Sequence, residues 1–397
     1  MQLSSTGPRP RVLHVSQPVD GGVARVVTDL VRAQLAAGAE VTVACPADGG
    51  LAPAAGALGC DVRHWRATRS PGPLLAREVR DLRRVLREVS PDLVHAHSAK
   101  AGLVARLAVR GRLPTVFQPH AWSFEAVGGA TRLLALNWER AGARWASRMV
   151  CVSEAERRTG RRSGIGGRWS VVPNGVDTDR FSPVPAHVGR SGIALLDGTA
   201  PAAPLVVCVG RLCRQKGQDV LVEAWHEVTR RVPSARLVLV GDGPDAPALR
   251  AAAPSSVLFA GSVADVVPWY RAADLVVLPS RWEGMALAPL EAMACGRPVV
   301  ITDVDGARES LPPGQGPRCL VPPERPDALA GAVADLLLDP PLRESLGRQG
   351  RRYVTTTHDV RHMTGAVLDV YRELLGTAPG GRATGVAHTE YRESIHS

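Results

Sequence analysis

The stretch Ser280-Arg-Trp-Glu-Gly-Met-Ala-Leu-Ala-Pro-Leu-Glu291 joins a predicted strand to a predicted helix. The apolar run from Asp274 to Pro279 before it is typical of a buried strand. The helix is predicted over 289–296, because Pro289 suits a first helical turn and Gly296 suits a C-terminal cap. The peptide N–H groups just before Pro289 therefore point out of a helix N-terminus at the carboxyl end of a strand. Such a position favours the binding of an anion.

Two carboxylates flank this predicted anion site. Glu283 lies in the loop and Glu291 in the first turns of the helix. Carboxylates are poor ligands for phosphate but good acceptors for hydroxyl groups, such as those of a sugar and a ribose. The pattern therefore indicates a nucleotide-sugar site. The alternative is that the acids only complement the positive end of the helix dipole.

The longer stretch Glu283-Gly-Met-Ala-Leu-Ala-Pro-Leu-Glu-Ala-Met-Ala-Cys-Gly-Arg-Pro-Val-Val300 resembles the donor-site motif of family 4 glycosyltransferases. That family has the GT-B fold, an α/β architecture in which two Rossmann-like parallel-sheet domains face each other across a cleft. The resemblance implies that Glu283 contacts the donor sugar and that Glu291 holds the ribose. It also implies that the following backbone amides hold the diphosphate, which are those of Gly284, Met285, Ala286 and Leu287.

Composition agrees with a two-domain globular protein. The chain has 397 residues, of which 45% are hydrophobic, and it contains no apolar run of transmembrane length. We expect no signal peptide, and seven scattered cysteines suggest reduced thiols, so we predict a cytoplasmic protein. The net charge is +10, almost all of it from arginine, because lysine occurs only at positions 100 and 216.

The N-terminal half opens with a βαβ pattern. A strand is predicted over 11–16, a glycine turn over 17–22, a helix over 23–35 and a strand over 40–45. The turn lacks the dinucleotide fingerprint, so we do not predict NAD binding. In the family, a Gly-Gly turn here lets the backbone approach the donor phosphate, which implies that Gly22 contacts the donor. A plain tight turn is the alternative.

Two later strands in this half end in polar residues. His97, Ser98 and Lys100 follow the strand predicted over 92–97, where an acceptor could lie, because parallel strands form a crevice at their carboxyl ends. His120 follows the strand predicted over 114–119. In family 4, a histidine at this place faces the donor sugar and the scissile bond. A structural role is the alternative for His120.

A basic surface is predicted in the same half. Residues 61–88 contain eight arginines and four acids, and 74–89 has the apolar spacing of an amphipathic helix. A solvated helix face is one interpretation, and peripheral contact with an anionic membrane is the other. No nucleic-acid motif accompanies these charges.

The C-terminal half carries a second donor motif. The turn Gly210-Arg-Leu-Cys-Arg-Gln-Lys-Gly217 follows a strand predicted over 205–209 and resembles the family's diphosphate-binding element. It implies that Arg211 and Lys216 offset the charge that develops on the leaving nucleoside diphosphate. Val263 is an expected backbone contact for the base. Asp303-Val-Asp305 spells a metal signature of a different fold, but it matches a turn of this family, and we expect no metal site there.

The sequence thus predicts two Rossmann-like domains and a sugar transfer. The predicted division is 1–178 for the acceptor-side domain, 179–204 for a hinge and linker, 205–358 for the donor domain, 359–376 for a helix that returns to the first domain, and 377–397 for a disordered tail. We expect a retaining, metal-independent glycosyltransferase of glycan, glycolipid or metabolite synthesis that needs no cofactor besides its nucleoside-diphosphate sugar. The expected catalytic residues are His120, Arg211, Lys216 and Glu283. A nucleotide-sugar epimerase and a non-catalytic binding protein are the rival hypotheses.

Overall fold

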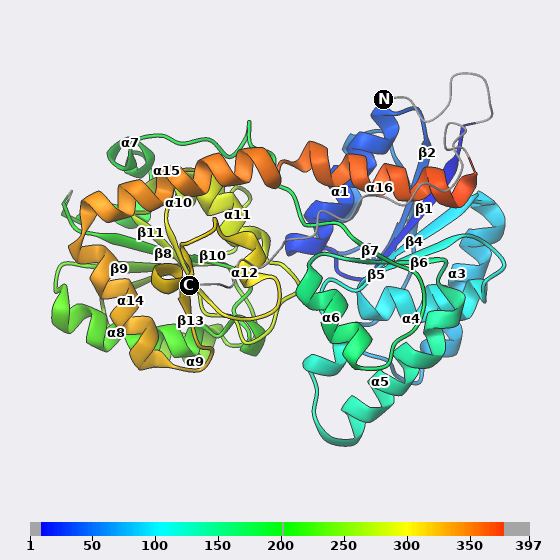
Figure 1. Cartoon of the computed structure of the whole chain (residues 1–397), viewed down its shortest axis with the longest axis horizontal. Coiled ribbons are helices and arrows are strands. Elements are labelled where there is room, and N and C mark those ends of the chain that lie inside the picture. Colours follow the sequence, from blue (N-terminus) through cyan, green and yellow to red (C-terminus); the bar gives the residue numbers. More distant parts are fainter. Residues whose placement is uncertain (1–8, 201, 377–397) are drawn as a thin grey trace, which may run out of the picture.

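Two parallel β-sheets, one in each lobe, organise the computed structural model, which describes residues 9–200 and 202–376 (Figure 1). Within those residues the first sheet has seven strands in the order β3-β2-β1-β4-β5-β6-β7. Their bounds are β1 Arg11–Ser16, β2 Glu40–Cys45, β3 Asp61–His64, β4 Leu93–His97, β5 Thr115–Gln118, β6 Arg148–Cys151 and β7 Trp169–Val171. Every pairing is parallel, as crossover helices require.

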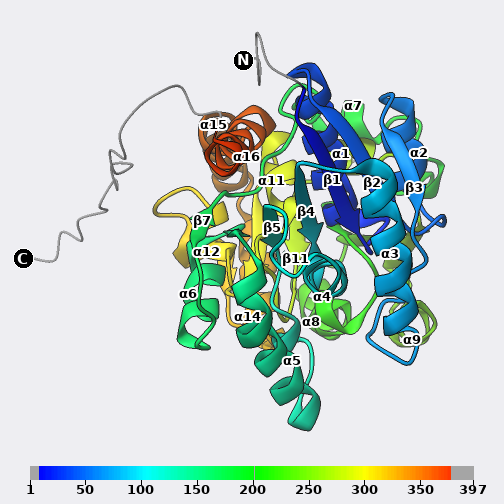
Figure 2. The same ribbon diagram turned by 90° about the vertical axis from the view of Figure 1, so that its right-hand side faces the viewer.

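Helices cover both faces of the first sheet. They are α1 Gly21–Ala36, α2 Leu51–Ala57, α3 Leu75–Val89, α4 Ser98–Val109, α5 Gly129–Gly142 and α6 Glu154–Arg162, with 3₁₀ turns at Ser123–Glu125 and Ala143–Trp145. Figure 2 faces this lobe and shows α3, α4 and α5 on one side of its sheet. Helix α4 begins at Ser98, directly after β4, so Ser98 and Lys100 lie in its first turn.

The second sheet has, in the described part of the chain, six strands in the order β10-β9-β8-β11-β12-β13. Their bounds are β8 Leu205–Val209, β9 Arg236–Val240, β10 Val257–Gly261, β11 Leu275–Leu278, β12 Val299–Thr302 and β13 Leu320–Val321. The central strands β8 and β11 are almost entirely buried and apolar, as expected for a parallel sheet covered on both faces.

The helices of the second half also surround their sheet, with one exception. They are α7 Ala186–Arg190, α8 Gln218–Arg231, α9 Ala246–Ala252, α10 Val267–Ala272, α11 Leu287–Ala294, α12 Ala307–Ser310, α13 Gly316–Cys319, α14 Pro326–Leu338, α15 Pro340–Thr357 and α16 Val360–Leu375, with 3₁₀ turns at Ala194–Leu196 and Arg214–Lys216. The short helix α7, in the segment predicted as linker, packs against α10. The exception is α16, which lies on α1 of the first lobe (Figures 1 and 2).

The chain crosses between the lobes at two adjacent places. Val176, after β7, donates its N–H to His358 O at 2.8 Å, and Val360 donates its N–H to Val176 O at 3.0 Å. A Cβ on Gly175 would lie 2.7 Å from Val360 Cα, so only glycine allows this approach. The two crossings therefore form a short parallel ladder, which suits a hinge.

The predicted GT-B architecture is confirmed by these two sheets and by α16. Within the described residues, no helix combines the length and the apolar character needed to cross a bilayer. The predicted tail over 377–397 lies outside the described residues.

Candidate active site

The N-termini of α1 and α11 meet across the lobes. A Cβ on Gly22 would lie 3.6 Å from Leu287 Cδ1, so the glycine turn packs directly against the start of α11. Neither N-cap residue, Asp20 or Ala286, caps its helix with a side chain. The first-turn N–H groups of both helices are thus left for another partner, and both positive dipole ends favour an anion.

The loop before α11 touches the first lobe. A Cβ on Gly284 would lie 2.8 Å from Val152 Cγ2 and 3.1 Å from Ala121 N, so glycine is needed for this contact. Ser153 Oγ donates to Gly284 O at 2.9 Å, and Asn174 Nδ2 donates to Met285 O at 2.7 Å. Two polar side chains of the first lobe therefore fix the predicted diphosphate loop.

Lys216 and Glu283 come together at this loop. Lys216 Nζ lies 2.5 Å from Glu283 Oε1, which also accepts from Ser280 Oγ at 2.7 Å. The turn is held against β11 because Gly217 has φ +66°, and a Cβ there would lie 2.1 Å from Pro279 O. Arg211 is exposed in the same turn. The turn and the loop, distant in sequence, thus form one charged cluster.

Glu291 is buried where the second lobe meets α1 of the first. Its Oε2 accepts from Tyr270 OH at 2.8 Å, and its Oε1 is 3.8 Å from Arg25 Nε of α1. Burial raises the pKa of Glu291, and the Arg25 guanidinium acts in the opposite direction. Val263, the predicted base contact, lies half-buried in the turn between β10 and α10.

His120 follows β5 in a strained backbone. Its φ is +58° and that of Ala121 is +122°, both in a region that residues with a Cβ rarely adopt. Ala121 N donates to the buried Glu156 Oε1 at 2.7 Å, which helps to hold the turn. Burial raises the pKa of Glu156 to about 8, against the effect of its backbone donors.

The predicted acceptor-side residues have different surroundings. His97 is fully buried, and its Nδ1 lies 3.1 Å from His120 Nε2. Ser98 is half-buried at the start of α4, with φ +71°. Lys100 is buried, and its Nζ lies 2.6 Å from Glu78 Oε2 of α3. We therefore assign Lys100 to the packing of α3 on α4 and do not retain it as an acceptor contact.

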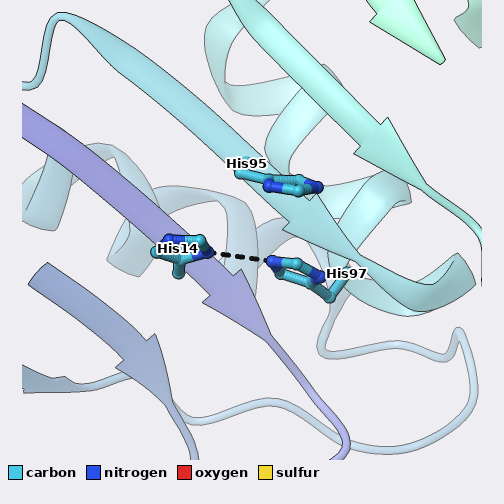
Figure 3. A group of neighbouring side chains, drawn as sticks. All are labelled: His14, His95 and His97. Atoms are coloured by element: carbon cyan, nitrogen blue, oxygen red, sulfur yellow. Dashed lines mark hydrogen bonds between the residues drawn. The ribbon is translucent and has the colours of Figure 1, made fainter. Parts of the chain in front are cut away.

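Three buried histidines form, among the residues that the structure describes, a group that could hold a metal ion. His14, His95 and His97 can each offer a ring nitrogen within 4.8 Å of the others. Figure 3 shows the three side chains on β1 and β4. The rings of His95 and His97 are tilted by 32° relative to each other, with centroids 4.0 Å apart. Both ring nitrogens of His97 lie within hydrogen-bonding distance of other histidines, so neither lone pair is left for a metal in this arrangement. His14 Nδ1 and His97 Nε2 instead bond each other at 2.9 Å.

The acids of the Asp-Val-Asp turn are bound to protein groups. Asp305 Oδ2 accepts from Thr159 Oγ1 at 2.8 Å, and Asp303 pairs with Arg308. Neighbouring Glu309 accepts from Glu154 N at 2.6 Å and caps α6 of the other lobe. Asp305 and Glu309 therefore form a latch between the lobes.

Some site residues were missed from the sequence. Arg25, Ser153, Asn174 and Glu309 make contacts between the lobes that no local motif indicates. His14 was missed because its strand reads as ordinary core, although His95 lies opposite it in the β1–β4 register.

Comparisons with known proteins cover both lobes. Residues 20–180 match the family model "Glycosyltransferase Family 4", and residues 203–339 match "Glycosyl transferases group 1". The chain is 31% identical over 387 residues to alpha-maltose-1-phosphate synthase of Mycolicibacterium smegmatis, covering 90% of this chain and 96% of that protein. It is 38% identical over 198 residues to a GDP-mannose-dependent alpha-(1-6)-phosphatidylinositol monomannoside mannosyltransferase of Mycobacterium tuberculosis, covering 46% of this chain. That match spans about half of the relative, 50% of its length.

Solved structures share the fold. Sucrose-phosphate synthase from Thermosynechococcus elongatus superimposes with a TM-score of 0.78 at 24% identity, covering 93% of this chain and 100% of that chain. Anabaena HepE in complex with UDP-glucose superimposes with a TM-score of 0.77 at 24% identity, covering 91% of this chain and 99% of that chain.

Proposed function

Because this chain belongs to glycosyltransferase family 4, we propose that it transfers a sugar from a nucleoside-diphosphate sugar to an acceptor hydroxyl. One observation carries the proposal: the uncapped N-termini of α1 and α11 meet beside the Lys216–Glu283 pair. Two dipole ends and fixed cations suit a diphosphate, and an adjacent carboxylate suits sugar hydroxyls.

In this proposal the donor lies mainly on the second lobe. Arg211 and Lys216 neutralise the diphosphate, and Glu283 exchanges its Lys216 contact for a sugar hydroxyl. Glu291 accepts from the ribose, and Val263 contacts the base. The peptide N–H group of Gly22 from the first lobe also contacts the diphosphate. The site is completed by the peptide N–H groups of the diphosphate loop, which are those of Gly284, Met285, Ala286 and Leu287.

The reaction joins the two lobes. The acceptor oxygen bonds to the anomeric carbon from the side of His120, His97 and Ser98. The bond between that carbon and the diphosphate breaks, and its electron pair leaves with the diphosphate. The acceptor proton passes to the departing phosphate oxygen. We propose retention of configuration, with fixed cations and N–H groups rather than a metal stabilising the leaving group.

The lobes act as the two sides of a cleft in this account. We propose domains at 1–178 and 205–358, with 179–204 as linker and 359–376 as the returning helix. The paired crossings at Val176 and Val360 would allow closure that excludes water from the sugar.

The acceptor is proposed to be lipid-linked or anionic. A groove of about 650 Å³ between α3 and α4 is lined by both apolar and arginine side chains, which are Pro73, Leu75, Ala76, Val79, Arg80, Arg83, Leu107 and Arg110. This chemistry supports peripheral contact with an anionic membrane face from the cytoplasm. Sedimentation with anionic vesicles checks it: binding at low salt that high salt reverses is expected, and no binding at low salt would contradict it.

Donor screening tests the main proposal. The melting temperature should rise with GDP-mannose or a UDP-sugar, and [¹⁴C]-labelled sugar should pass to glycolipid acceptors. GDP-mannose is tested first because relatives are named as dependent on it. A new epimer without acceptor would indicate an epimerase, and stabilisation without turnover on any acceptor would indicate a binding protein. Either outcome would overturn the proposal.

A further inference from the structure

A row of buried imidazoles leads from the interior of the first lobe to His120. Gln34 Oε1 of α1 lies 2.8 Å from His14 Nε2, and His14 Nδ1 lies 2.9 Å from His97 Nε2. His97 Nδ1 then lies 3.1 Å from His120 Nε2. His14 and His97 are fully buried, and Figure 3 shows their rings pointing toward each other from β1 and β4.

The orientation of the Gln34 amide sets the direction of these bonds. Its Nε2 donates to Tyr371 OH of α16 at 3.4 Å, which turns its oxygen toward His14. An amide oxygen only accepts, so the proton in the first bond belongs to His14 Nε2. Because Tyr371 OH receives this bond, its own proton goes to His95 Nδ1, 2.6 Å away.

A neutral imidazole carries one N–H, so each bond determines the next. With Nε2 protonated, His14 Nδ1 accepts, and His97 Nε2 must be the donor to it. His97 Nδ1 then accepts, and His120 Nε2 must donate. The lone pair of His120 is therefore on Nδ1. Within residues 9–200 and 202–376, no hydrogen bond to His120 Nδ1 is found, which leaves it for a ligand hydroxyl.

The row stays neutral near pH 7. Burial lowers the pKa of His14 to about 4 and that of His120 to about 3, and it lowers the pKa of His97 well below the ordinary value. In the part of the chain that the structure describes, the other titratable side chains in contact with the row are His95 and Tyr371. Burial lowers the pKa of His95 and raises that of Tyr371, so both are neutral as well.

We propose that Gln34, acting through His14 and His97, is a positioning residue that fixes His120 as the Nε2–H tautomer, with Nδ1 as the hydrogen-bond acceptor toward a hydroxyl of the donor sugar. The row ends in an amide, which cannot take up a proton, so it orients His120 and does not conduct protons away. This inference rests on the proposed function for its catalytic meaning, but the tautomer order itself does not.

Variants of Gln34 test the kinetic part. Gln34→Met removes the acceptor, so both tautomers of the row are populated, and kcat should fall about 10- to 100-fold with the donor KM little changed. Gln34→Glu keeps an acceptor oxygen, so kcat should stay within a few-fold of wild type. The buried carboxylate favours imidazolium, so the acid limb of the kcat–pH profile should move to higher pH.

Thr28→Val is the matched control. It removes a side-chain bond of the same helix, Thr28 Oγ1 to Ala24 O at 2.9 Å, and should leave kcat near wild type. A structural role for Gln34 alone would lower the melting temperature but leave kcat and the pH profile of the folded Met variant unchanged. That result would overturn the proposal.

Histidine ¹⁵N NMR tests the tautomer order without any reaction. In the wild type at pH 7.5, His14, His97 and His120 should each carry the proton on Nε2, with signals assigned by single His→Gln variants. Gln34→Met should mix the tautomers. A proton on His120 Nδ1 in the wild type would overturn the inference, even if sugar transfer is observed. The expected tautomers with no transfer from any donor would instead refute only the proposed function.

Discussion

Both sheets are parallel, but polar side chains lie inside the first sheet's core and outside that of the second. In the first lobe β1 and β4 carry His14, His95 and His97 inside the layer between the sheet and its helices. In the second lobe β8 and β11 are apolar, and Lys216 and Glu283 lie in loops beyond their ends. A buried polar layer must be satisfied group by group, whereas an apolar platform tolerates conservative change. We therefore expect core substitutions to lower the free energy of unfolding more in the first lobe than in the second.

The largest effect is expected from a buried charge in the first lobe. Arg106 and Glu139 form a fully buried pair at 2.8 Å, with the guanidinium over the Phe117 ring at 4.0 Å. Arg106→Met leaves the carboxylate unpaired and should lower the free energy of unfolding by about 3–5 kcal/mol. Tryptophan fluorescence in urea measures this.

The second lobe supplies the counterpart for that comparison. Leu275→Met in buried β11 keeps the volume and should cost less than about 1.5 kcal/mol. Glu139→Leu added to Arg106→Met should recover much of the loss. Equal losses for Arg106→Met and Leu275→Met would break the contrast between the lobes.

The next largest effect should come from the turn after β8 in the second lobe. Lys216→Ala removes a fixed cation beside the proposed diphosphate and should lower kcat for transfer about 10²- to 10³-fold. Arg214→Ala is the control, because Arg214 is exposed in the same turn. Initial rates with a labelled donor measure both. Similar rates for the two variants would remove Lys216 from the site.

Acid should destabilise the first lobe in particular. Burial lowers the pKa of His14 from 6.5 to about 4, so the unfolded chain takes up this proton first as pH falls. The stability due to neutral His14 is complete above pH 6.5 and is lost progressively toward pH 4, by about 3 kcal/mol. Melting curves against pH measure it. His14→Gln should flatten this dependence, and an unchanged slope would contradict the assignment.

The smallest effect is expected at the latch between the lobes. Glu309 accepts from Glu154 N at 2.6 Å and from Ala155 N at 2.8 Å, so its charge lies at the N-terminus of α6. Glu309→Gln should weaken the contact between the lobes by about 1 kcal/mol. Small-angle scattering should show a larger radius of gyration. Exposed Glu344→Gln on α15 is the control, and equal radii would argue against a latch.

The same contrast explains what the sequence could predict. The candidate site residues of the second lobe could be predicted because Lys216, Glu283 and Glu291 lie in short contiguous motifs at strand ends. The central strands of both sheets could be predicted from their apolar runs, but the edge strands β3 and β13 were missed, because β3 is polar and β13 has only two residues. The domain boundaries and the individual site roles stay predictions.

The rest depended on contacts between distant segments. Lys100 looked available for an acceptor because its partner, Glu78, lies on a different helix. The row from Gln34 to His120 needs the lateral order of β1, β4 and β5, which a single sequence does not give. Glu309 acts on α6 of the other lobe, 155 positions away.

The position of α16 has a consequence for how the protein is made. Gln34 and Tyr371 touch across 337 positions, and every element of the second lobe is synthesised between them. On the ribosome, α1 and the histidines beneath it must therefore wait for α16, with their faces uncovered. Chains that end before residue 360 should accordingly show a first lobe that chaperones still recognise, whereas the second lobe can already be complete.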